Sequence, residues 1–439
     1  MSERLPDEWT SVPLVSLVRG AGRYGASASA VAYDASLPRY VRITDIDDHG
    51  RLRPASRASI DRAQAKGYRL RPHDLVLARS GATVGKSYLY RPEDGECAYA
   101  GYLVRFALDP ARCVPSFVSY YTQSERFTEW VRATVRGSVQ PNINIAELSA
   151  LPVPLPPRAE QRAIVAVLSD ATHLIESSAQ VVEKLGRVFR SLVVELLTAG
   201  VDERGQLRPL RVAPGSGISL DAPPPNFPTA RVDALLADVD PAMRSGPFGS
   251  ELKKADLVSV GVPLLGIDNI EVDHFVARYS RFVPTERARE LARYTVRPHD
   301  VMITVMGTVG RSCLVPADIG PALSSKHIWA LTFDPRRYHP LLASLQINHA
   351  PWVAAHFRRE AQGGALSAIR SETLRSLRLP LPPRAEQDRI AAVLGVAQAR
   401  LATERAALAK HRRVFRALLD ELISGRVRVG GAGAGQTSA

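Results

Sequence analysis

Pro-Pro-Arg-Ala-Glu-Gln at residues 156–161 returns letter for letter at residues 382–387, a shift of 226 residues (382 − 156). The same shift carries Val-Phe-Arg at residues 188–190 onto the same tripeptide at residues 414–416. An offset that holds over roughly forty positions indicates the tandem duplication of a domain-sized unit. A chain built from two similar halves is suited to recognising two similar targets.

A helical pattern follows each copy of the hexapeptide. Proline is tolerated at a helix entry, and Glu160 suits the positive end of the helix dipole. Apolar residues then recur at alternating steps of four and three, which is the seam of a coiled coil, and Gly200 and Gly425 end the two helices. The predicted seam residues are Ile164, Leu168, Ile175, Val182, Leu185, Phe189 and Leu192 in the first helix and Ile390, Leu394, Leu401, Leu408, Phe415 and Leu418 in the second.

Each predicted seam carries a polar residue at the same central place, Ser178 in the first helix and Glu404 in the second. In an antiparallel pair these two residues would meet near the middle, where a polar layer can fix the register. The alternative is that each helix packs only on its own globular domain. At ~1.5 Å per residue, ~40 residues make a rod of about 60 Å, which is long enough to hold two domains well apart.

The segments ahead of the two helices have strand-like patterns that correspond to each other. Residues 71–77 match residues 297–303, and both runs lead into glycine turns, at Gly81 and Gly307. Short β-rich runs punctuated by Gly and Pro predict an α+β fold, with two α/β domains that each have a curved, barrel-like sheet and short helices, separated by two long antiparallel helices that form a coiled coil. The expected organisation is a first domain at residues 1–157, its helix at 158–200, a linker rich in Pro and Gly at 201–228, a second domain at 229–383, its helix at 384–425 and a disordered tail at 426–439.

The composition favours a nucleic-acid partner and excludes a membrane span. Fifty-seven Lys and Arg against forty-four Asp and Glu give a net charge of +13. A basic surface favours a polyanion through counterion release, without sequence preference, although an Arg-rich sequence also follows from a GC-rich genome. The sequence has no run of ~18 apolar residues and no signal-peptide pattern at its N-terminus, so a cytoplasmic location is expected. Because Cys97, Cys113 and Cys313 are far apart and form no CxxC pair, we expect reduced thiols and neither a zinc site nor a disulfide.

Catalytic interpretations of short motifs are not supported by the sequence. Residues 81–87 look like a phosphate-binding loop, but the glycine spacing is one residue short of a Walker A motif, which favours a strand-to-strand bend. Asp240 with Glu251 and Lys253 resembles the acid and acid-x-Lys pattern of metal-dependent nucleases, but the first half lacks it. The sequence also lacks an Asn-Pro-Pro-aromatic segment for methyl transfer and a spaced histidine pair for a metal. No catalytic residue and no metal site are therefore predicted.

Polar residues on the glycine turns and the loops near them are the candidate DNA contacts. Gln and Asn can bond adenine in a bidentate way and Arg can do the same to guanine, and a basic residue beside hydroxyls can meet a phosphate. The alternative for each residue is a loop that merely caps its domain. The candidates are Arg79, Ser80, Thr83, Lys86, Ser138, Gln140 and Asn142 in the first half and Lys253, Thr304, Thr308, Arg311 and Ser312 in the second. Since the halves agree at scaffold positions and differ in the loops, they would read two different short sequences.

These features together resemble the specificity subunit of a Type I restriction–modification system. The resemblance rests on the hexapeptides at the domain–helix boundaries, the long helices, the glycine turns and the segment Ser-Gly-Pro-Phe-Gly-Ser-Glu-Leu-Lys at residues 245–253. It covers essentially the whole chain, to about Gly425. The first half has residues 20–30 in place of that segment, without a clear counterpart.

The resemblance implies two target-recognition domains, each reading one half of a split DNA site, and an antiparallel coiled coil that sets the gap. Such subunits have no activity of their own. They recruit two modification subunits, which use S-adenosylmethionine to methylate adenine at N6, and in some systems two restriction subunits that use ATP and Mg. This chain would then bind double-stranded DNA and hold no cofactor itself. The alternative is a scaffold that binds nucleic acid non-specifically, or a specificity-like subunit of another phage-defence complex.

Overall fold

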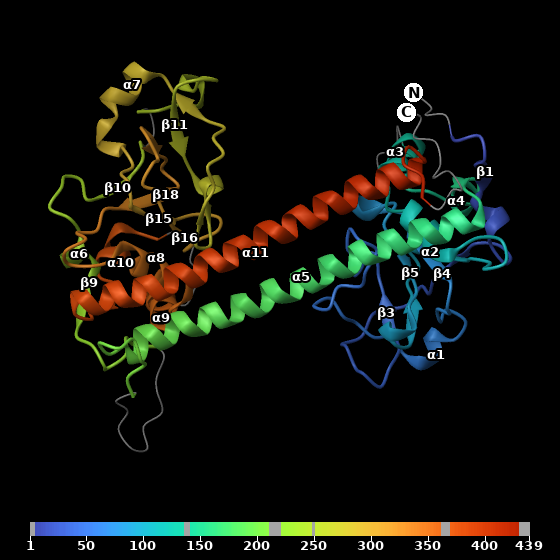
Figure 1. The fold of residues 1–439 in the computed structure, drawn as a ribbon, viewed down its shortest axis with the longest axis horizontal. Coiled ribbons are helices and arrows are strands. Elements are labelled where there is room, and N and C mark those ends of the chain that lie inside the picture. The colour runs from blue at the N-terminus through green and yellow to red at the C-terminus, as the bar shows by residue number, and fades with distance from the viewer. Residues whose placement is uncertain (1–4, 136–140, 210–220, 248–250, 361–368, 430–439) are drawn as a thin grey trace, which may run out of the picture. The chain divides into compact units, whose positions relative to one another are not determined.

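The computed structural model describes residues 5–135, 141–209, 221–247, 251–360 and 369–429. The chain separates into two compact units. The first unit contains Met1–Ala179 and Ala406–Ala439, and the second unit contains Gln180–Arg405. Two long helices, α5 (Arg158–Ala199) and α11 (Arg384–Ser424), each contribute one part to the first unit and the rest to the second (Figure 1).

The first unit combines short strands with short helices. Its strands are β1 (Thr10–Pro13), β2 (Arg23–Tyr24), β3 (Arg39–Val41), β4 (Asp74–Ala78), β5 (Ser87–Leu89), β6 (Cys97–Tyr99), β7 (Leu103–Ala107) and β8 (Pro152–Leu155). Its short helices are α1 (Arg62–Ala65), α2 (Pro115–Tyr121), α3 (Glu125–Thr134) and α4 (Ile145–Ser149), with 3-10 turns η1 (Leu14–Leu17), η2 (Gly81–Thr83) and η3 (Pro92–Asp94). The central sheet is antiparallel with the order β2-β7-β4-β5, while β3 and β6 form a parallel pair and β1 pairs with β8.

The second unit has the same kind of architecture. Its strands are β9 (Thr229–Arg231), β10 (Met243–Ser245), β11 (Val262–Leu265), β12 (Ile270–Glu271), β13 (His274–Phe275), β14 (Phe282–Val283), β15 (Val301–Thr304), β16 (Ser312–Leu314), β17 (Leu323–Ser324), β18 (Ile328–Leu331) and β19 (Arg378–Pro380). Its short helices are α6 (Val232–Leu235), α7 (Thr285–Glu290), α8 (Pro340–His349), α9 (Pro351–Glu360) and α10 (Ser371–Arg375), with 3-10 turns η4 (Lys254–Asp256), η5 (Ile267–Asn269) and η6 (Ala292–Tyr294).

The two units share one strand topology. The antiparallel order β10-β18-β15-β16 in the second unit corresponds to β2-β7-β4-β5 in the first. The parallel pair of β11 and β17 corresponds to β3 and β6, and the pairing of β9 with β19 corresponds to that of β1 with β8. The predicted α+β class is therefore confirmed, and the sequence repeat is a repeat of structure.

The central strands β4 and β15 are buried along their whole length. Successive side chains of a strand point to opposite faces, and in β4 the pair Leu75 and Leu77 joins one core cluster while Val76 joins another. In β15, Ile303 and Met302 divide in the same way between two clusters. Both faces of each strand are covered, which explains why these segments are continuous apolar runs. Each fully buried aliphatic side chain contributes about 1.5–3 kcal/mol.

A buried carboxylate opens the central strand of the second unit, at the end of the repeated Arg-Pro-His-Asp sequence. The side chains of Asp300 and Arg244 form an ion pair with exposed fractions of 0% and 1%. Asp300 also accepts hydrogen bonds from the Thr332 hydroxyl and the Arg297 N–H, both at 2.6 Å. Burial lowers the pKa of Arg244 to about 10, which still leaves the guanidinium charged at neutral pH. The pair is therefore a neutralised, hydrogen-bonded cluster inside the domain.

The first unit has the equivalent carboxylate with a different partner. Asp74 pairs with Arg105 of β7 at 3.2 Å and accepts a hydrogen bond from the Arg71 N–H at 2.8 Å. The side chain of Arg105 is 18% exposed, so it is less completely desolvated than the arginine of the second unit. The equivalent buried aspartates of the two domains thus pair with arginines that lie on different strands.

The two long helices run antiparallel within each unit. In the first unit Ile164, near the start of α5, shares a core with Leu422, near the end of α11. In the second unit Leu196, near the end of α5, shares a core with Ile390, near the start of α11. The prediction of two long antiparallel helices packed together is confirmed. Among the predicted seam residues, the buried ones are Ile164, Leu168, Phe189, Ile390, Leu394, Leu401, Leu408 and Phe415, and the half-buried ones are Ile175, Val182, Leu185, Leu192 and Leu418.

The polar layer predicted for the middle of the seam is wrong in its composition. Ser178 Oγ lies 2.9 Å from His411 Nδ1, whereas Glu404 forms an ion pair with Arg400 of its own helix at 2.5 Å. Equivalent positions of two repeats face each other only at the midpoint of an antiparallel pair. The observed register sets Ser178 opposite a residue one heptad beyond Glu404, so these two positions are not at that midpoint.

The three cysteines are free and buried. Burial raises the pKa of Cys97 to about 12, that of Cys113 to about 11 and that of Cys313 to about 12, so all three stay protonated at neutral pH. No helix in the described part of the chain is long and apolar enough to cross a membrane. The described residues also contain no group of three or more His, Cys, Asp or Glu side chains placed to hold a metal ion.

Candidate nucleic-acid interface

The glutamine of each hexapeptide attaches a long helix to its own domain. Gln161 Oε1 accepts a hydrogen bond from the backbone N–H of Val114, and Gln387 Oε1 accepts one from His339, both at 2.8 Å. Val114 and His339 are the N-cap residues of α2 and α8, where N–H groups have no partner inside the helix. Each glutamine also donates to the first proline of its own hexapeptide, at 2.9 and 3.0 Å. The start of each long helix is therefore fixed to the helical part of the domain before it.

The glutamate of each hexapeptide binds the segment that leaves the other long helix. Glu160 accepts a hydrogen bond from Arg428 Nη2 at 2.9 Å, just beyond the end of α11. Glu386 accepts the N–H of Val201 at 2.8 Å and pairs with Arg208 at 2.9 Å, just beyond the end of α5. Both glutamates are buried. The repeated Glu and Gln therefore make the same kinds of contact in both units. They hold each domain and the two helix ends beside it in one arrangement.

The glycine turns are bends between antiparallel strands, as predicted. Gly81 and Gly85 have φ of +76° and +89°, and Gly307 and Gly310 have φ of +72° and +84°. A side chain at Gly85 would also meet Val131 at 3.1 Å. The chain continues from these turns into β5 and β16 rather than into a helix. A P-loop needs its phosphate site at a helix N-terminus, so this interpretation is excluded for both turns.

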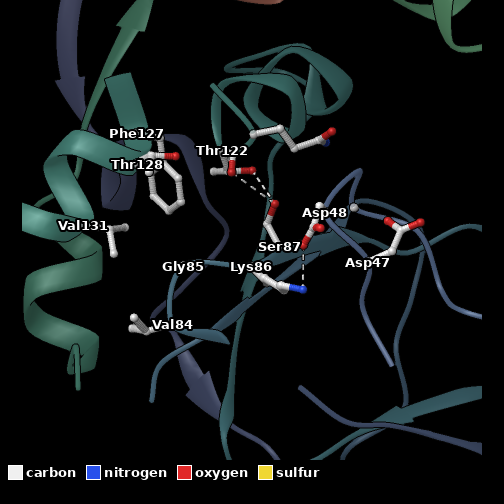
Figure 2. A pocket seen from close by; sticks show the side chains of 12 residues that line it. Asp47, Asp48, Val84, Gly85, Lys86, Ser87, Thr122, Phe127, Thr128 and Val131 are labelled. Carbon is white, nitrogen blue, oxygen red and sulfur yellow. Dashed lines mark hydrogen bonds and ion pairs between the residues drawn. The ribbon is translucent and has the colours of Figure 1, made fainter. Parts of the chain in front are cut away.

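Lys86 of the first turn lies at a cavity of about 210 Å³ in the first unit. Its Nζ is 2.7 Å from Asp48 Oδ1, and Figure 2 shows the two side chains pointing toward each other. The hydrogen bond from Lys86 lowers the pKa of Asp48, so this carboxylate stays charged at neutral pH. Thr122 and Phe127 from the helical side complete the wall (Figure 2). The charge of Lys86 is therefore already neutralised inside the domain.

The other predicted contacts of the first domain lie where β4 ends. Ser80 forms a β-bridge with Asn142, and Arg79 Nη1 donates to Asn142 Oδ1 at 3.3 Å, so the structure brings these three residues together. The Thr83 hydroxyl is buried and has no hydrogen-bond partner among the described residues. Two predicted contacts, Ser138 and Gln140, lie outside the described residues.

The predicted contacts of the second domain divide into interior and exposed residues. Thr304 and Ser312 are buried, with their hydroxyls bonded to the turn backbone and to a serine of α8. The Thr308 hydroxyl is buried without a partner in the described part of the chain. Arg311 and Lys253 are exposed. Because a buried hydroxyl cannot reach DNA without rearrangement, we leave Thr304 and Ser312 out of the proposed DNA surface.

One of the two acidic residues of the nuclease-like pattern, Glu251, has structural partners. Glu251 accepts hydrogen bonds from Arg293 Nη2 at 2.7 Å and from the Tyr294 hydroxyl at 2.8 Å. Asp240 precedes a cis proline in the segment ahead of β10. The Glu251 carboxylate is therefore occupied within the domain, which gives the nuclease interpretation no structural support.

The first glycine of the Gly-Pro-Phe-Gly-Ser segment has a structural counterpart in the first half, within residues 20–30. A side chain at Gly246 would overlap the carbonyl of Ser324, and one at Gly25 would overlap that of Ala100 in the same way. Both glycines directly follow equivalent strands, β10 and β2. The offset at this place is 221 residues (246 − 25) rather than 226. This offset is five residues shorter (226 − 221), so the constant offset of 226 does not align the two glycines. The glycine itself was a signal in the sequence that could have revealed the match.

The protein is therefore an internal duplication. Each half has a β-rich domain with the same main strand order, and the same hexapeptide attaches each domain to the antiparallel long helices. Residues 57–187 match the family described as "Type I restriction modification DNA specificity domain". The repeat offset of 226 residues carries this segment onto residues 283–413.

Relatives and solved structures agree with this match. The EcoKI specificity subunit of Escherichia coli strain K12 is 22% identical over 309 residues, which cover 69% of this chain and 62% of that protein. The Type I S subunit of M. genitalium has a TM-score of 0.56 at 14% identity and covers 96% of this chain and 97% of its own. A chain solved in work on the complex assembly of the type I R-M system has a TM-score of 0.52 at 19% identity, with coverage of 97% and 100%. The two structures show that the fold is shared.

The chain is similar to the specificity subunits of Type I restriction–modification systems. The resemblance found in the sequence is thereby confirmed.

Proposed function

We propose that this chain reads a split DNA sequence, with each globular domain recognising one half-site. The observation that carries the proposal is the contrast between the two domains. They share a strand order and the same hexapeptide attachment, yet Arg79 in the first domain is replaced by the buried Val305 at the equivalent place in the second. One scaffold with different side chains at its turn would recognise two different short sequences.

The charge of the chain supports DNA as the ligand. The net charge of +13 favours duplex DNA through the release of counterions. Phosphate contacts of this kind position a protein on the duplex, whereas contacts to base edges supply the sequence preference. Exposed basic residues such as Arg311 and Lys253 suit the first role.

The paired helices are proposed to set the distance between the half-sites. Helix α5 has 42 residues and α11 has 41. At ~1.5 Å per residue such helices are about 60 Å long, which exceeds one ~34 Å turn of duplex. Their register is held within each unit by a packed seam, and in the first unit also by Ser178 with His411. The pair is therefore suited to act as a spacer of fixed length.

The partners and cofactors follow from the family. We propose that the chain acts in the cytoplasm with two modification subunits, which methylate adenine at N6 with S-adenosylmethionine, and in some systems with two restriction subunits that use ATP and Mg. An enzyme that modifies a base takes it out of the stack into a pocket, and that pocket would belong to the modification subunit. The role of this chain is then to place the correct adenine before that pocket.

Mapping N6-methyladenine across the genome of the source organism tests the function. We expect a split motif, in which two short specific halves flank a non-specific gap of constant length, because two domains read at a fixed separation. Deleting this chain should remove the methylation and restoring it should return it. A continuous motif, or methylation that persists after deletion, would contradict the proposal. Equal affinity for random and cognate duplex at ~0.15 M salt, instead of a ratio of at least ~10³, would favour the non-specific scaffold that the basic charge also permits.

A further inference from the structure

The backbone at Arg79 is held on both sides by the scaffold of the first domain. The Arg79 N–H donates to the carbonyl of Tyr102 at 3.0 Å, and the Arg79 carbonyl accepts a hydrogen bond from Ile143 at 2.8 Å. Its side chain donates from Nε to the carbonyl of Gly101 at 3.4 Å and from Nη1 to Asn142 Oδ1 at 3.3 Å. The guanidinium therefore has a defined direction before any ligand arrives.

Two exposed tyrosines hold the face of this guanidinium. The centre of the Arg79 guanidinium lies 4.8 Å from the ring centroid of Tyr24 and 6.0 Å from that of Tyr102. These tyrosines are 44% and 60% exposed, so they contribute little to the core of the domain. The face of an aromatic ring attracts a cation at this range. A cluster of this kind orders a long side chain at the surface, which lowers the entropy that binding would otherwise cost.

The charge of Arg79 is not neutralised by a carboxylate of the described residues. Its partners are a carbonyl, an amide oxygen and two rings. Two other basic side chains of the domain do pair with a carboxylate, since Lys86 pairs with Asp48 and Arg105 pairs with Asp74. Arg79 thus keeps its full charge, and in the described part of the chain no hydrogen bond is assigned to its Nη2.

The second domain shows that the scaffold does not require an arginine at this place. Val305 has the same backbone frame, because its N–H donates to His327 at 3.0 Å and its carbonyl accepts from Ile369 at 3.3 Å. Its side chain is apolar and only 6% exposed. The neighbouring strand β10 places Ser245 where β2 places Tyr24, and Ser245 is buried. The exposed Arg and Tyr cluster is therefore particular to the first domain.

We propose that Arg79 reads a guanine in the half-site of the first domain, with Tyr24, Tyr102 and Asn142 as positioning residues. The proposal rests on the function proposed above. A guanidinium offers paired donors that match O6 and N7 of guanine in the major groove, which is the commonest specific contact between protein and DNA. A phosphate could meet the same donors, but it would give affinity without sequence preference.

The test compares the full complex containing wild-type chain, Arg79→Ala and Arg79→Gln, with Arg69→Ala as a matched control. Arg69 is a surface arginine of the same domain that pairs with Glu96 at 2.8 Å. Methylation of a duplex library with every single-base change in the motif is measured. Both Arg79 variants should lose the preference for guanine at one position by about 5- to 150-fold, which is the discrimination of one bidentate contact. The control should leave every position unchanged, and the second half-site should stay intact in all variants.

Several outcomes would overturn the inference and leave the proposed function standing. One is a first half-site without guanine. Another is an unchanged preference in both Arg79 variants. A third is a uniform loss of methylation on all sequences, which would assign Arg79 to a phosphate. If Arg79→Ala unfolds the domain, as seen by loss of the first half-site altogether, Arg79→Gln decides, since it keeps a polar side chain that can still donate a hydrogen bond to its neighbours. A wild-type complex with no split motif would overturn the proposed function and the inference together.

Discussion

Replacing residues 1–157 by the first domain of another family member is expected to change one half-site completely and to leave the other as it was. Each domain has hydrophobic clusters of its own, such as that of Val41 and Tyr88 in the first and that of Ile270 and Cys313 in the second. The exchange point falls between the hexapeptide's prolines and the first residue of α5. The sequence specificity for one half-site is therefore expected to be transferred with the domain. The methylated motif of the chimaera measures this directly.

The reciprocal exchange of residues 229–383 is the matched control, because it should change only the other half-site. The donor must keep the apolar residues that face α11 in the first unit, since Phe415 and Leu419 belong to the same cluster as Phe117 of α2. A chimaera whose two half-sites both change would show that the domains do not read independently.

Substituting Asp300 by Ala is expected to lower the free energy of unfolding of the second domain by about 3–5 kcal/mol, because removing one partner leaves an uncompensated buried charge. Arg244 would keep its position, with a side chain only 1% exposed, and would lose its carboxylate. Thermal and urea unfolding of the purified chain, followed by circular dichroism, measure the loss.

Asp74→Ala in the first domain is the matched control for this substitution. Its partner Arg105 is 18% exposed and can reach water, so the loss should be smaller. Adding Arg244→Met to Asp300→Ala should recover part of the stability, since it removes the unpaired charge. Equal losses in the two domains, or a change below about 1 kcal/mol for Asp300→Ala, would show that burial of this pair is not what stabilises the domain.

The helices and the central strands could be predicted because their patterns are local. A heptad seam and a terminal glycine describe a long helix without knowledge of the rest of the chain, and Gly200 and Gly425 do follow α5 and α11 with φ of +77°. The apolar runs before the glycine turns likewise became β4 and β15. These elements place the candidate DNA surface at the ends of two buried strands.

The side-chain environment of that surface depends on long-range packing and could not be predicted from the sequence. Thr304 and Ser312 carry hydroxyl groups that could bind a phosphate, but tertiary packing buries both side chains. Tyr24 meets Arg79 only because β2 pairs with β7 across a long stretch of chain. The mistaken pairing of Ser178 with Glu404 has a similar cause, since the register of an antiparallel pair follows from both helix ends at once.

The most direct test of the account is the gap length of the motif after one heptad is inserted into each long helix, after Ala179 in α5 and before Lys410 in α11. These places preserve the contact of Ser178 with His411 and keep the apolar seam in phase. Seven residues at ~1.5 Å add about 10 Å, or about three base pairs at ~3.4 Å each. Replacing seven exposed residues at the same places without insertion controls for the change of sequence. We predict two unchanged half-sites separated by a gap about three base pairs longer. An unchanged gap with full methylation would contradict the claim that the paired helices set the distance between two reading domains.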